Sequence, residues 1–335
     1  MATEKFSIDF DSAVTNVYKV GSGLVLSEPT VAVVGADGKN EFRTGGTEAR
    51  KLVGKTAGNT KIVFPVFEGE IVNERVATEL LSFFLKKVRV PGGFNSVSAV
   101  MGVPCGTEEE MLSKYYSVAK GAGIDKVYFI EAPILSALGQ RLPLSDSSPC
   151  FLIDMAGGTT NIAALSLDGI IAGISVGIGS NKITTDIIDY VADVYGLQIG
   201  LLTAERLKKE IGSLSEGDEL STVVNGRDSL SGTPRAVSLK ASDIIEPVRK
   251  YYDKIAELSK AVLVKLPPEV SAEITHAGIY VSGEAACVYG LESYYKNKFG
   301  IQINVAENAA MSVALGGGIA AGNSELIKKL SIKLK

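Results

Sequence analysis

Apolar and polar positions repeat with two different periods along this chain, and each period predicts one kind of element. In the first half, short apolar or alternating runs predict strands at residues 6–10, 14–20, 23–26 and 96–104 and in the segment KVYFIEAP, which Pro133 ends. Residues 72–88 instead place Val72, Val76, Leu80, Phe84 and Val88 at helical spacing. A second helix is predicted after residue 106, with Thr107 and Glu110 at capping-box spacing.

The second half repeats this plan after the turn-rich segment LPLSDSSP at residues 142–149. Strands are predicted at residues 150–155, 160–167 and 170–176 and in AGIYVSG, which ends at Gly283. Helices are predicted at residues 181–195, 203–212 and 242–265, and an exposed hairpin region at residues 214–235. Alternation of strands and helices over the whole chain is typical of an α/β fold.

Two short segments echo one another at a constant offset. Ile8-Asp9 and Thr15-Asn16-Val17 align with Ile153-Asp154 and Thr160-Asn161-Ile162, and 154 − 9 and 160 − 15 both equal 145. Each copy lies between a strand that enters a turn and a strand that leaves it. The echo predicts a duplicated α/β core with a cleft between the two copies.

The chemistry of these turns fits a metal-bound polyphosphate. Successive backbone N–H groups in a tight turn bind anionic oxygens, and glycine permits close approach to a phosphate. The acids at the strand ends would repel phosphate directly, but Asp9 and Asp154 can hold water on a Mg²⁺ ion that bridges phosphates. One such turn alone would be an ordinary hairpin; two in register favour a nucleotide site.

Length, charge and rare residues narrow the class of protein. A length of 335 residues suggests about two domains, and a formal net charge of −4 gives no reason to expect a nucleic-acid partner. Cys105, Cys150 and Cys287 lack metal-ligand spacing and are expected to be buried, reduced thiols of a cytoplasmic protein. The one histidine, His276, is expected at a helix end just before a strand, so the sequence favours neither a zinc site nor a Ser-His-Asp triad. We expect neither a signal peptide nor a membrane span.

Seven motifs in order resemble the MreB family of bacterial actins within the actin-like ATPase superfamily. They are IDFDSAVTNVYKVGSGLVLSEPTVAVV, VSAVMGVP, KVYFIEAPILSALG, IDMAGGTTNIAALSLDGI, TAERLKKEIGS, GTPRAVSLK and GIYVSGEAACVYGLE. The resemblance covers nearly the whole chain. It implies a two-lobed actin-like fold with a duplicated ribonuclease-H-like core and a central nucleotide cleft.

The resemblance also implies a domain division. One lobe would comprise residues 1–140 and 310–335, with a small subdomain at about 28–70. The other would comprise residues 141–309, with a small subdomain at about 181–240. Such a protein would be an ATPase that forms head-to-tail filaments, acts in cell shape or morphogenesis and contacts the inner face of the membrane and membrane morphogenesis proteins.

Site residues follow from the resemblance position by position. ATP and Mg²⁺ would be the ligands, and Glu131 and Asp154 the catalytic acids, with Glu131 orienting the attacking water and Asp9 and Asp154 holding Mg²⁺ through water. The phosphate loops would comprise Asp9, Asp11, Ser12 and Ala13 in the first lobe and Asp154, Gly157, Gly158, Thr159 and Thr160 in the second. Glu205, Lys208, Gly283, Glu284 and Ala285 would surround the nucleoside.

Three of these residues have plainer interpretations. An acid directly before Ala132-Pro133 can be the N-terminal partner of a helix, which is the alternative for Glu131. Glu205 and Lys208 stand three apart, so they can instead form a surface ion pair of small value.

Five positions depart from the family pattern. Asp11 replaces a glycine and Val14 an asparagine in the first loop, Ala156 replaces a glycine in the second, and Glu284-Ala285 replaces glycines after Gly283. Asp11 is expected to tolerate the left-handed turn geometry of glycine. Its charge is harder to accommodate, because a carboxylate about 4 Å from a phosphate charge costs about 1 kcal/mol in water and about 4 kcal/mol at a dielectric of 20. These acids favour an alternative function, a nucleotide-degenerate actin-like scaffold or adaptor without significant ATPase activity.

Two segments are candidates for membrane contact. The loop LKKVRVPGGFNS offers Val90 and Phe94 beside Lys86, Lys87 and Arg89, a combination that suits an anionic lipid surface or, equally, a solvated turn after a helix. The basic C-terminal tail ELIKKLSIKLK alternates apolar residues with lysines and can either touch lipid or dock on the protein.

Overall fold

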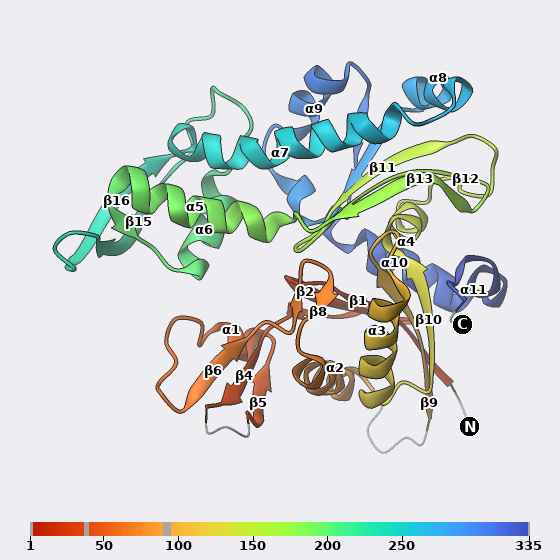
Figure 1. Ribbon diagram of the computed structural model, residues 1–335, viewed down its shortest axis with the longest axis horizontal. Coiled ribbons are helices and arrows are strands. Elements are labelled where there is room, and N and C mark those ends of the chain that lie inside the picture. The colour runs from red at the N-terminus through yellow and green to blue at the C-terminus, as the bar shows by residue number, and fades with distance from the viewer. Residues whose placement is uncertain (1–2, 37–39, 90–94, 334–335) are drawn as a thin grey trace.

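The computed structural model describes residues 3–36, 40–89 and 95–333, and its first large sheet has five strands. In the order β10-β9-β1-β2-β3 these strands are Lys126–Glu131, Ser96–Val103, Thr3–Phe10, Val14–Lys19 and Gly23–Pro29. β1, β2 and β3 form the predicted antiparallel meander, and β9 and β10 run parallel to β1. This sheet forms the lower lobe in Figure 1.

The second large sheet repeats the same plan in the upper lobe. In the order β13-β12-β11-β17-β18 its strands are Gly169–Val176, Thr160–Ser166, Cys150–Met155, Ile279–Ser282 and Ile303–Val305. Again three consecutive strands are antiparallel, and two later strands add parallel to the first of them. The predicted duplication of the core is therefore confirmed in the order and direction of all ten strands.

The register shows the duplication residue by residue. Asp9 pairs with Asn16 across the β1–β2 hairpin, and Asp154 pairs with Asn161 across the β11–β12 hairpin. Because both acids are next to last in their strands, both copies bring an acid and an amide to the same end of a sheet.

Apolar helix faces cover both sheets. In the first lobe these helices are α2 (Glu74–Val88) and α3 (Glu109–Gly121). In the second they are α5 (Ser180–Tyr195), α7 (Ala241–Leu263), α8 (Pro268–Ala277) and α9 (Leu291–Phe299). Val76, Leu80 and Phe84 of α2 are buried as predicted, whereas Val72 precedes the helix and is exposed. The predicted position of His276 at a helix end is confirmed.

The predicted capping box before α3 is wrong. The N-cap residue is Glu108, and no side chain caps this helix. The hydroxyl of Thr107 instead donates to the carbonyl oxygen of Pro104, because the chain turns sharply after β9. In contrast, Asn73 caps α2 through a hydrogen bond from the backbone N–H of Val76, at 3.1 Å.

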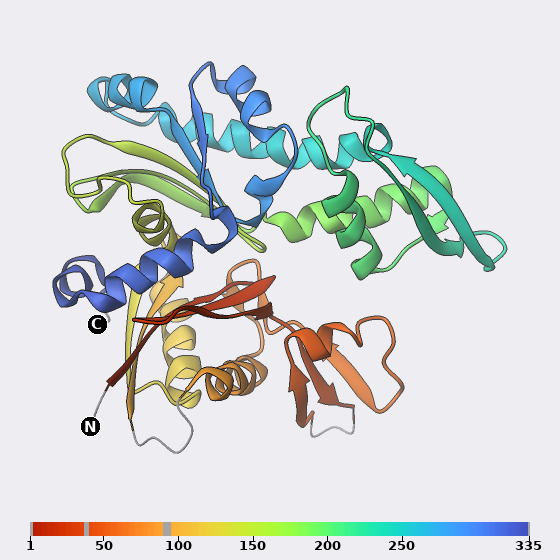
Figure 2. The same cartoon turned by 180° about the vertical axis from the view of Figure 1, so that it is seen from behind.

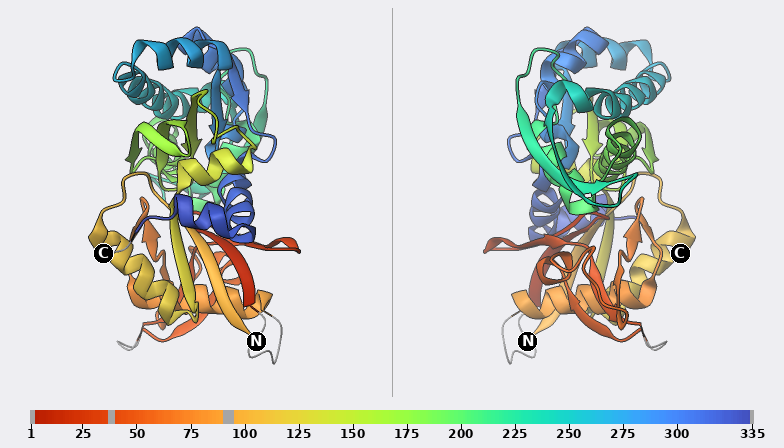
Figure 3. Two further views of the ribbon diagram at one scale, coloured as in Figure 1. Left: turned by 90° about the vertical axis from the view of Figure 1, so that its right-hand side faces the viewer. Right: turned by 90° about the vertical axis from the view of Figure 1, so that its left-hand side faces the viewer.

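Two helices lie between the large sheets and join the lobes. α4 (Ala132–Gly139) and α10 (Ser312–Gly322) pack side by side, as Figures 1 and 3 show from different directions. Buried residues of both helices share one apolar cluster with Val100 and Ile130 of the first sheet and Leu152 and Ala163 of the second. This cluster makes the contact between the lobes a continuous core.

A small sheet extends from each lobe on the same side of the molecule. In the first lobe, β5-β4-β6 (Phe42–Gly45, Ala32–Gly35 and Thr60–Val63) stands beside α1 (Thr47–Arg50). In the second, β14-β15-β16 (Leu197–Gln198, Ser221–Asp228 and Pro234–Lys240) packs on α6 (Leu201–Ile211). A short hairpin of β7 (Val66–Phe67) and β8 (Glu70–Ile71) leads back to the first large sheet. The domain boundaries given above stay predictions.

The C-terminal tail is docked on the protein. Helix α11 (Ser324–Leu330) buries Leu330 and packs Leu326 and Ile327 against the cluster between the lobes. Ile332 packs on the first lobe, where its backbone N–H donates to the carbonyl oxygen of Phe129. Figure 2 shows both termini on the same side of the molecule. The apolar residues of the described tail are thus occupied within the chain.

Two further expectations concern the membrane. In the described part of the chain, none of the helices is long and apolar enough to cross a bilayer. Val90 and Phe94 lie outside the described residues, so a membrane contact there stays a prediction.

Candidate functional site

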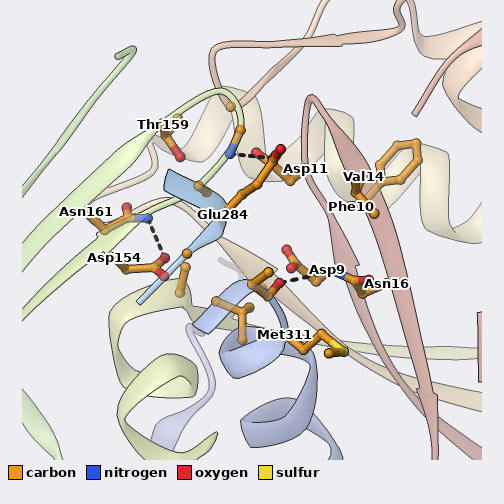
Figure 4. A pocket seen from close by; sticks show the side chains of 18 of the residues that line it. Asp9, Phe10, Asp11, Val14, Asn16, Asp154, Thr159, Asn161, Glu284 and Met311 are labelled. Carbon is orange, nitrogen blue, oxygen red and sulfur yellow. Dashed lines mark hydrogen bonds between the residues drawn. The ribbon is translucent and has the colours of Figure 1, made fainter. Parts of the chain in front are cut away.

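The two equivalent turns face each other across a cavity between the lobes. The cavity has a volume of about 280 Å³ and is lined from both sheets, as Figure 4 shows. Seven of the predicted site residues line it, namely Asp9, Asp11, Asp154, Gly157, Thr159, Gly283 and Glu284. The prediction that residues after Asp9 and after Asp154 share one crevice is therefore confirmed.

The second turn is held rigidly by its own lobe. The backbone N–H of Ala156 donates to the carbonyl oxygen of Thr159, which closes the turn. The carbonyl oxygens of Ala156 and Gly157 accept hydrogen bonds from Ser180 and Asn181, the first backbone N–H groups of α5. With these carbonyl groups bound to α5, the N–H groups of Gly157 and Gly158 are left to point toward the first lobe.

Asp154 is buried at the end of β11, and each of its carboxylate oxygens accepts one side-chain hydrogen bond. One carboxylate oxygen accepts from the hydroxyl of Ser282 at 2.8 Å, and the other from the amide of Asn161 at 3.4 Å. The Ser282 hydroxyl is itself hydrogen-bonded to that of Ser136 on α4, at 2.6 Å. Burial raises the pKa of Asp154 to about 6, against the lowering effect of Ser282 and Asn161.

Asp9 occupies the equivalent position in the first lobe. Burial, together with the charges of Asp11 and Asp154, raises the pKa of Asp9 well above its ordinary value. The amide of Asn16 opposes this shift and also donates to the carbonyl oxygen of Ala310, at 3.5 Å. With Asp11 and Glu284, four carboxylates thus line one cavity.

This donor set suits Mg²⁺, which prefers hard oxygen ligands and keeps several of its waters. Within the described residues, no three acidic, cysteine or histidine side chains form a direct metal cage. Contact of Asp9 and Asp154 with such an ion through water stays a prediction; the charge of the ion would offset the repulsion between the two carboxylates.

Asp11 adopts a different geometry from the one expected. It does not have the positive φ of a turn glycine, so the left-handed geometry that Asp11 was expected to tolerate is not used here. Its carboxylate instead reaches across to the other lobe and accepts from the backbone N–H of Gly157 at 2.9 Å and of Gly158 at 3.3 Å. It also accepts from the N–H of Ala13 at 3.3 Å.

The two turns touch directly at these glycines. A Cβ atom at Gly157 would lie 2.2 Å from the Cβ of Ala13, and one at Gly158 would lie 2.2 Å from the hydroxyl of Ser12. Any larger residue would therefore separate the lobes. The hydroxyl of Ser12 also accepts the N–H of Gly69 at 3.4 Å, so the β7–β8 hairpin joins this contact.

The two threonines of the second turn differ in surroundings. Thr159 lines the cavity. The hydroxyl of Thr160 donates to the carbonyl oxygen of Ile178 at 2.6 Å and is hydrogen-bonded to Tyr251 at 2.9 Å. Its side chain thus connects β12 to the segment before α5 and to α7.

Glu131 lies at the end of β10, beside the cavity. Its neighbour Ala132 lines the cavity, whereas Glu131 itself does not. One carboxylate oxygen accepts the backbone N–H of Gly106 at 2.7 Å. Glu131 is also the N-cap residue of α4, but its side chain makes no capping hydrogen bond. The alternative interpretation of Glu131 as a helix cap is therefore correct for its position and wrong for its carboxylate.

The predicted nucleoside residues occupy the outer end of the site. A second cavity of about 330 Å³ is lined by Lys208, Glu284 and Ala285, and it shares Lys209 and Glu284 with the first. Lys208 donates to the carbonyl oxygen of Ser180 at 3.0 Å, and burial lowers its pKa while Glu284 raises it. Glu205 forms an ion pair with Arg50 of the first lobe, so the two residues are not the surface pair considered above.

Sequence reasoning missed several residues of the site. Asn16 and Asn161 belong to the repeated segments, and each pairs with one of the two acids. Their equal spacing from Asp9 and Asp154 was a signal in the sequence, but it was not used to assign the two amides to the site. Ser180, Lys209 and Gly69 gave no such signal, because only the tertiary structure brings them to the cavities. The same is true of Arg50, which only the tertiary structure brings to Glu205.

Two lobes built on the same sheet, with a helix pair between them and a shared cavity at the equivalent turns, define the actin-like class of proteins. Solved structures agree. MreB5 of Spiroplasma citri bound to AMPPNP has a TM-score of 0.91 at 28% identity, covering 98% of each chain. The MamK double helical filament has a TM-score of 0.80 at 17% identity, over 96% of this chain and 99% of that one, which shows the fold alone.

Sequence comparison identifies the family within that class. The family model described as MreB/Mbl protein matches residues 3–329. The cell shape-determining protein MreB of Escherichia coli (strain K12) is 34% identical over 323 residues, which cover 95% of this chain and 93% of that protein. The chain belongs to the MreB/Mbl family and is an MreB-like cytoskeletal actin.

Proposed function

We propose that this protein binds and hydrolyses ATP with Mg²⁺ between its lobes and assembles head to tail into filaments that act in cell shape. The observation that carries this proposal is the pair of equivalent turns, one from each repeat, that face a single cavity. MreB5 of Spiroplasma citri, with a TM-score of 0.91, is known bound to AMPPNP and to ADP. A ligand held by both turns would couple the angle between the lobes to contacts between subunits.

The residues of the site have distinct proposed roles. The backbone N–H groups of Gly157 and Gly158 and the hydroxyls of Ser12 and Thr159 would bind phosphate oxygens. Asp9 and Asp154 would hold Mg²⁺ through water, and the ion supplies positive charge that offsets the phosphates. Lys208, Glu284 and Ala285 line the cavity where the nucleoside would lie.

Glu131 would orient the attacking water and accept its proton. The carboxylate lies at a strand end beside the cavity, where one oxygen accepts the backbone N–H of Gly106 and the thiol of Cys105 is also hydrogen-bonded to the carboxylate. The proposed head-to-tail contact would give open filaments, because a head-to-tail interface whose rotation does not close into a ring adds subunits without limit.

We expect Glu131→Ala to abolish phosphate release and to leave assembly intact. The measurements are phosphate release and pelleting by ultracentrifugation, both with Mg²⁺ and ATP. Glu257→Ala is the matched control, since this exposed acid on α7 pairs only with Lys254 among the interactions described. Undiminished phosphate release by Glu131→Ala would remove Glu131 from the proposed role.

The second candidate function is an actin-like scaffold without significant nucleotide chemistry. The observation that favours it is the carboxylate of Asp11, which already occupies N–H groups that a phosphate would use. Isothermal titration calorimetry with Mg²⁺ and ATP separates the two functions. Heat of binding below millimolar nucleotide supports the ATPase, and its absence together with nucleotide-independent pelleting supports the scaffold. Contacts with the membrane and with morphogenesis proteins stay predictions under both.

A further inference from the structure

The carboxylate of Asp11 lies at the closest contact between the lobes and collects backbone N–H groups from both. Figure 4 shows it facing the turn of the second lobe, where Gly157 and Gly158 donate to it. Ser12 and Ala13 of its own loop also direct N–H groups at it. An anion that receives four backbone N–H groups from two facing turns has the environment of a bound phosphate.

These N–H groups cannot serve a second anion at the same time. Each backbone amide has one hydrogen to donate. A phosphate placed between the turns would therefore have to displace Asp11, and it would also have to push apart turns that are in contact through Ala13 and Ser12.

Charge acts in the same direction. Asp9 and Asp154 add two more carboxylates to the cavity that Asp11 lines. Glu284 adds a further carboxylate, and among the described lining residues the one cation is Lys209. Lys208 donates to Ser180, and Arg50 is paired with Glu205. Each added phosphate charge at this end of the cavity is thus disfavoured. The outer cavity, which Lys209 and Glu284 connect to the first, lies away from Asp11 and retains room for a nucleoside and shorter polyphosphate.

We propose that Asp11 is an internal substitute for a terminal phosphate, so that the lobes close without nucleotide and the site selects nucleoside diphosphate over nucleoside triphosphate. This selection rests on the proposed nucleotide binding, whereas the closure of the lobes by Asp11 does not. Hydrolysis, where it occurs, would then proceed from a weakly held triphosphate to a better held diphosphate.

The first test needs no nucleotide. Amide hydrogen exchange at Gly157 and Gly158 is measured by NMR for the nucleotide-free wild type and for Asp11→Asn and Asp11→Gly. We expect exchange at both amides to become at least tenfold faster in Asp11→Gly, with Asp11→Asn in between because it keeps one acceptor oxygen. The matched control is Asp228→Asn, since Asp228 accepts two backbone N–H groups in a hairpin far from the site, at 2.8 and 3.1 Å. Unchanged exchange at Gly157 and Gly158 in Asp11→Gly would overturn closure by Asp11.

The second test compares two ligands. Calorimetry with Mg²⁺-ADP and Mg²⁺-ATP should give a lower Kd for ADP in the wild type. In Asp11→Gly the ratio of the Kd for ATP to the Kd for ADP should fall at least tenfold. Asp228→Asn should leave this ratio unchanged. An unchanged ratio in Asp11→Gly would overturn the selection. Absence of binding of both nucleotides to every variant would overturn the proposed function and the selection with it, while the exchange data would still decide the closure.

Discussion

At the scale of single residues, the three thiols are not equivalent. Burial raises the pKa of Cys150 to about 11, and burial together with Glu131 raises that of Cys105 to about 12. Cys287, in contrast, is exposed, so the prediction of three buried thiols is wrong there. It lies in a short 3₁₀ helix (η1, Glu284–Cys287) that follows Gly283 and lines the outer cavity. Since thiolates are the reactive form, the three should differ in rate of alkylation.

We expect iodoacetamide at pH 8 to label Cys287 first and to leave Cys150 unlabelled in the native protein. Saturating Mg²⁺-ADP should slow the labelling of Cys287 at least fivefold, because the nucleoside would cover the outer cavity. Peptide mass spectrometry over time measures both rates. Cys287→Ser serves as the control for assignment. Labelling of Cys287 that ADP does not slow, at a concentration where calorimetry shows binding, would place the nucleoside elsewhere.

At the scale of elements, α10 is the clearest case in which packing overrides propensity. Its sequence SVALGGGIAAG places three consecutive glycines inside a helix, where each is unfavourable by about 1 kcal/mol relative to alanine. The structure shows why they are needed. A Cβ atom at Gly316 would lie 1.7 Å from the carbonyl oxygen of Leu135, and one at Gly317 would lie 2.0 Å from the hydroxyl of Ser7. Close approach of α10 to α4 and β1 therefore requires glycine.

We expect Gly316→Ala to lower the free energy of unfolding by about 2 kcal/mol or more, because a backbone contact cannot move aside as a side chain would. Urea denaturation followed by circular dichroism measures the effect. Gly322→Ala is the matched control, since that position of the same helix is exposed and its nearest contact is an ordinary 3.8 Å. The control should be neutral or stabilising by up to about 1 kcal/mol. Equal effects of both substitutions would show that α10 is not held so closely against α4.

At the scale of the whole molecule, the lobes are joined at three levels. α4 and α10 form the shared core, the two equivalent turns meet through Asp11, and the ion pair of Arg50 with Glu205 connects α1 beside one small sheet to α6 beside the other. Arg50 is 33% exposed and Glu205 15%, so we expect the pair to contribute no more than about 1 kcal/mol to stability. Its effect should instead appear in the angle between the lobes.

We expect Arg50→Ala to broaden the distance between the small sheets in the nucleotide-free protein. Single-molecule energy transfer between dyes at Gly58→Cys and Leu230→Cys, in a Cys287→Ser background, reports this distance. Arg43→Ala is the control, since its ion pair with Glu41 at 3.5 Å lies within one lobe. In Arg50→Ala alone, the mean transfer efficiency should fall and the distribution of efficiencies should become wider. An identical distribution in both variants would mean that the ion pair does not restrain the lobes.

Much of this architecture could be predicted because it depends on short-range pattern. The alternation of apolar residues predicted the meander of β1 to β3 and the main helices within a few residues. The offset of 145 between Asp9 and Asp154 predicted two equivalent turns on one cavity. A strand's register follows from which of its faces is buried, so local sequence is enough to place an acid at its end.

The sequence by itself determined the element order, the duplicated core and the membership of an actin-like family, since these depend on periodicity and motifs along the chain. Only the tertiary structure decided that Asp11 turns toward Gly157 instead of adopting a left-handed turn, and that Arg50 takes Glu205 as its partner. Both outcomes depend on how closely two lobes approach. That distance is set by the packing of α4 and α10 between them, and no local pattern around Asp11 or Arg50 encodes it.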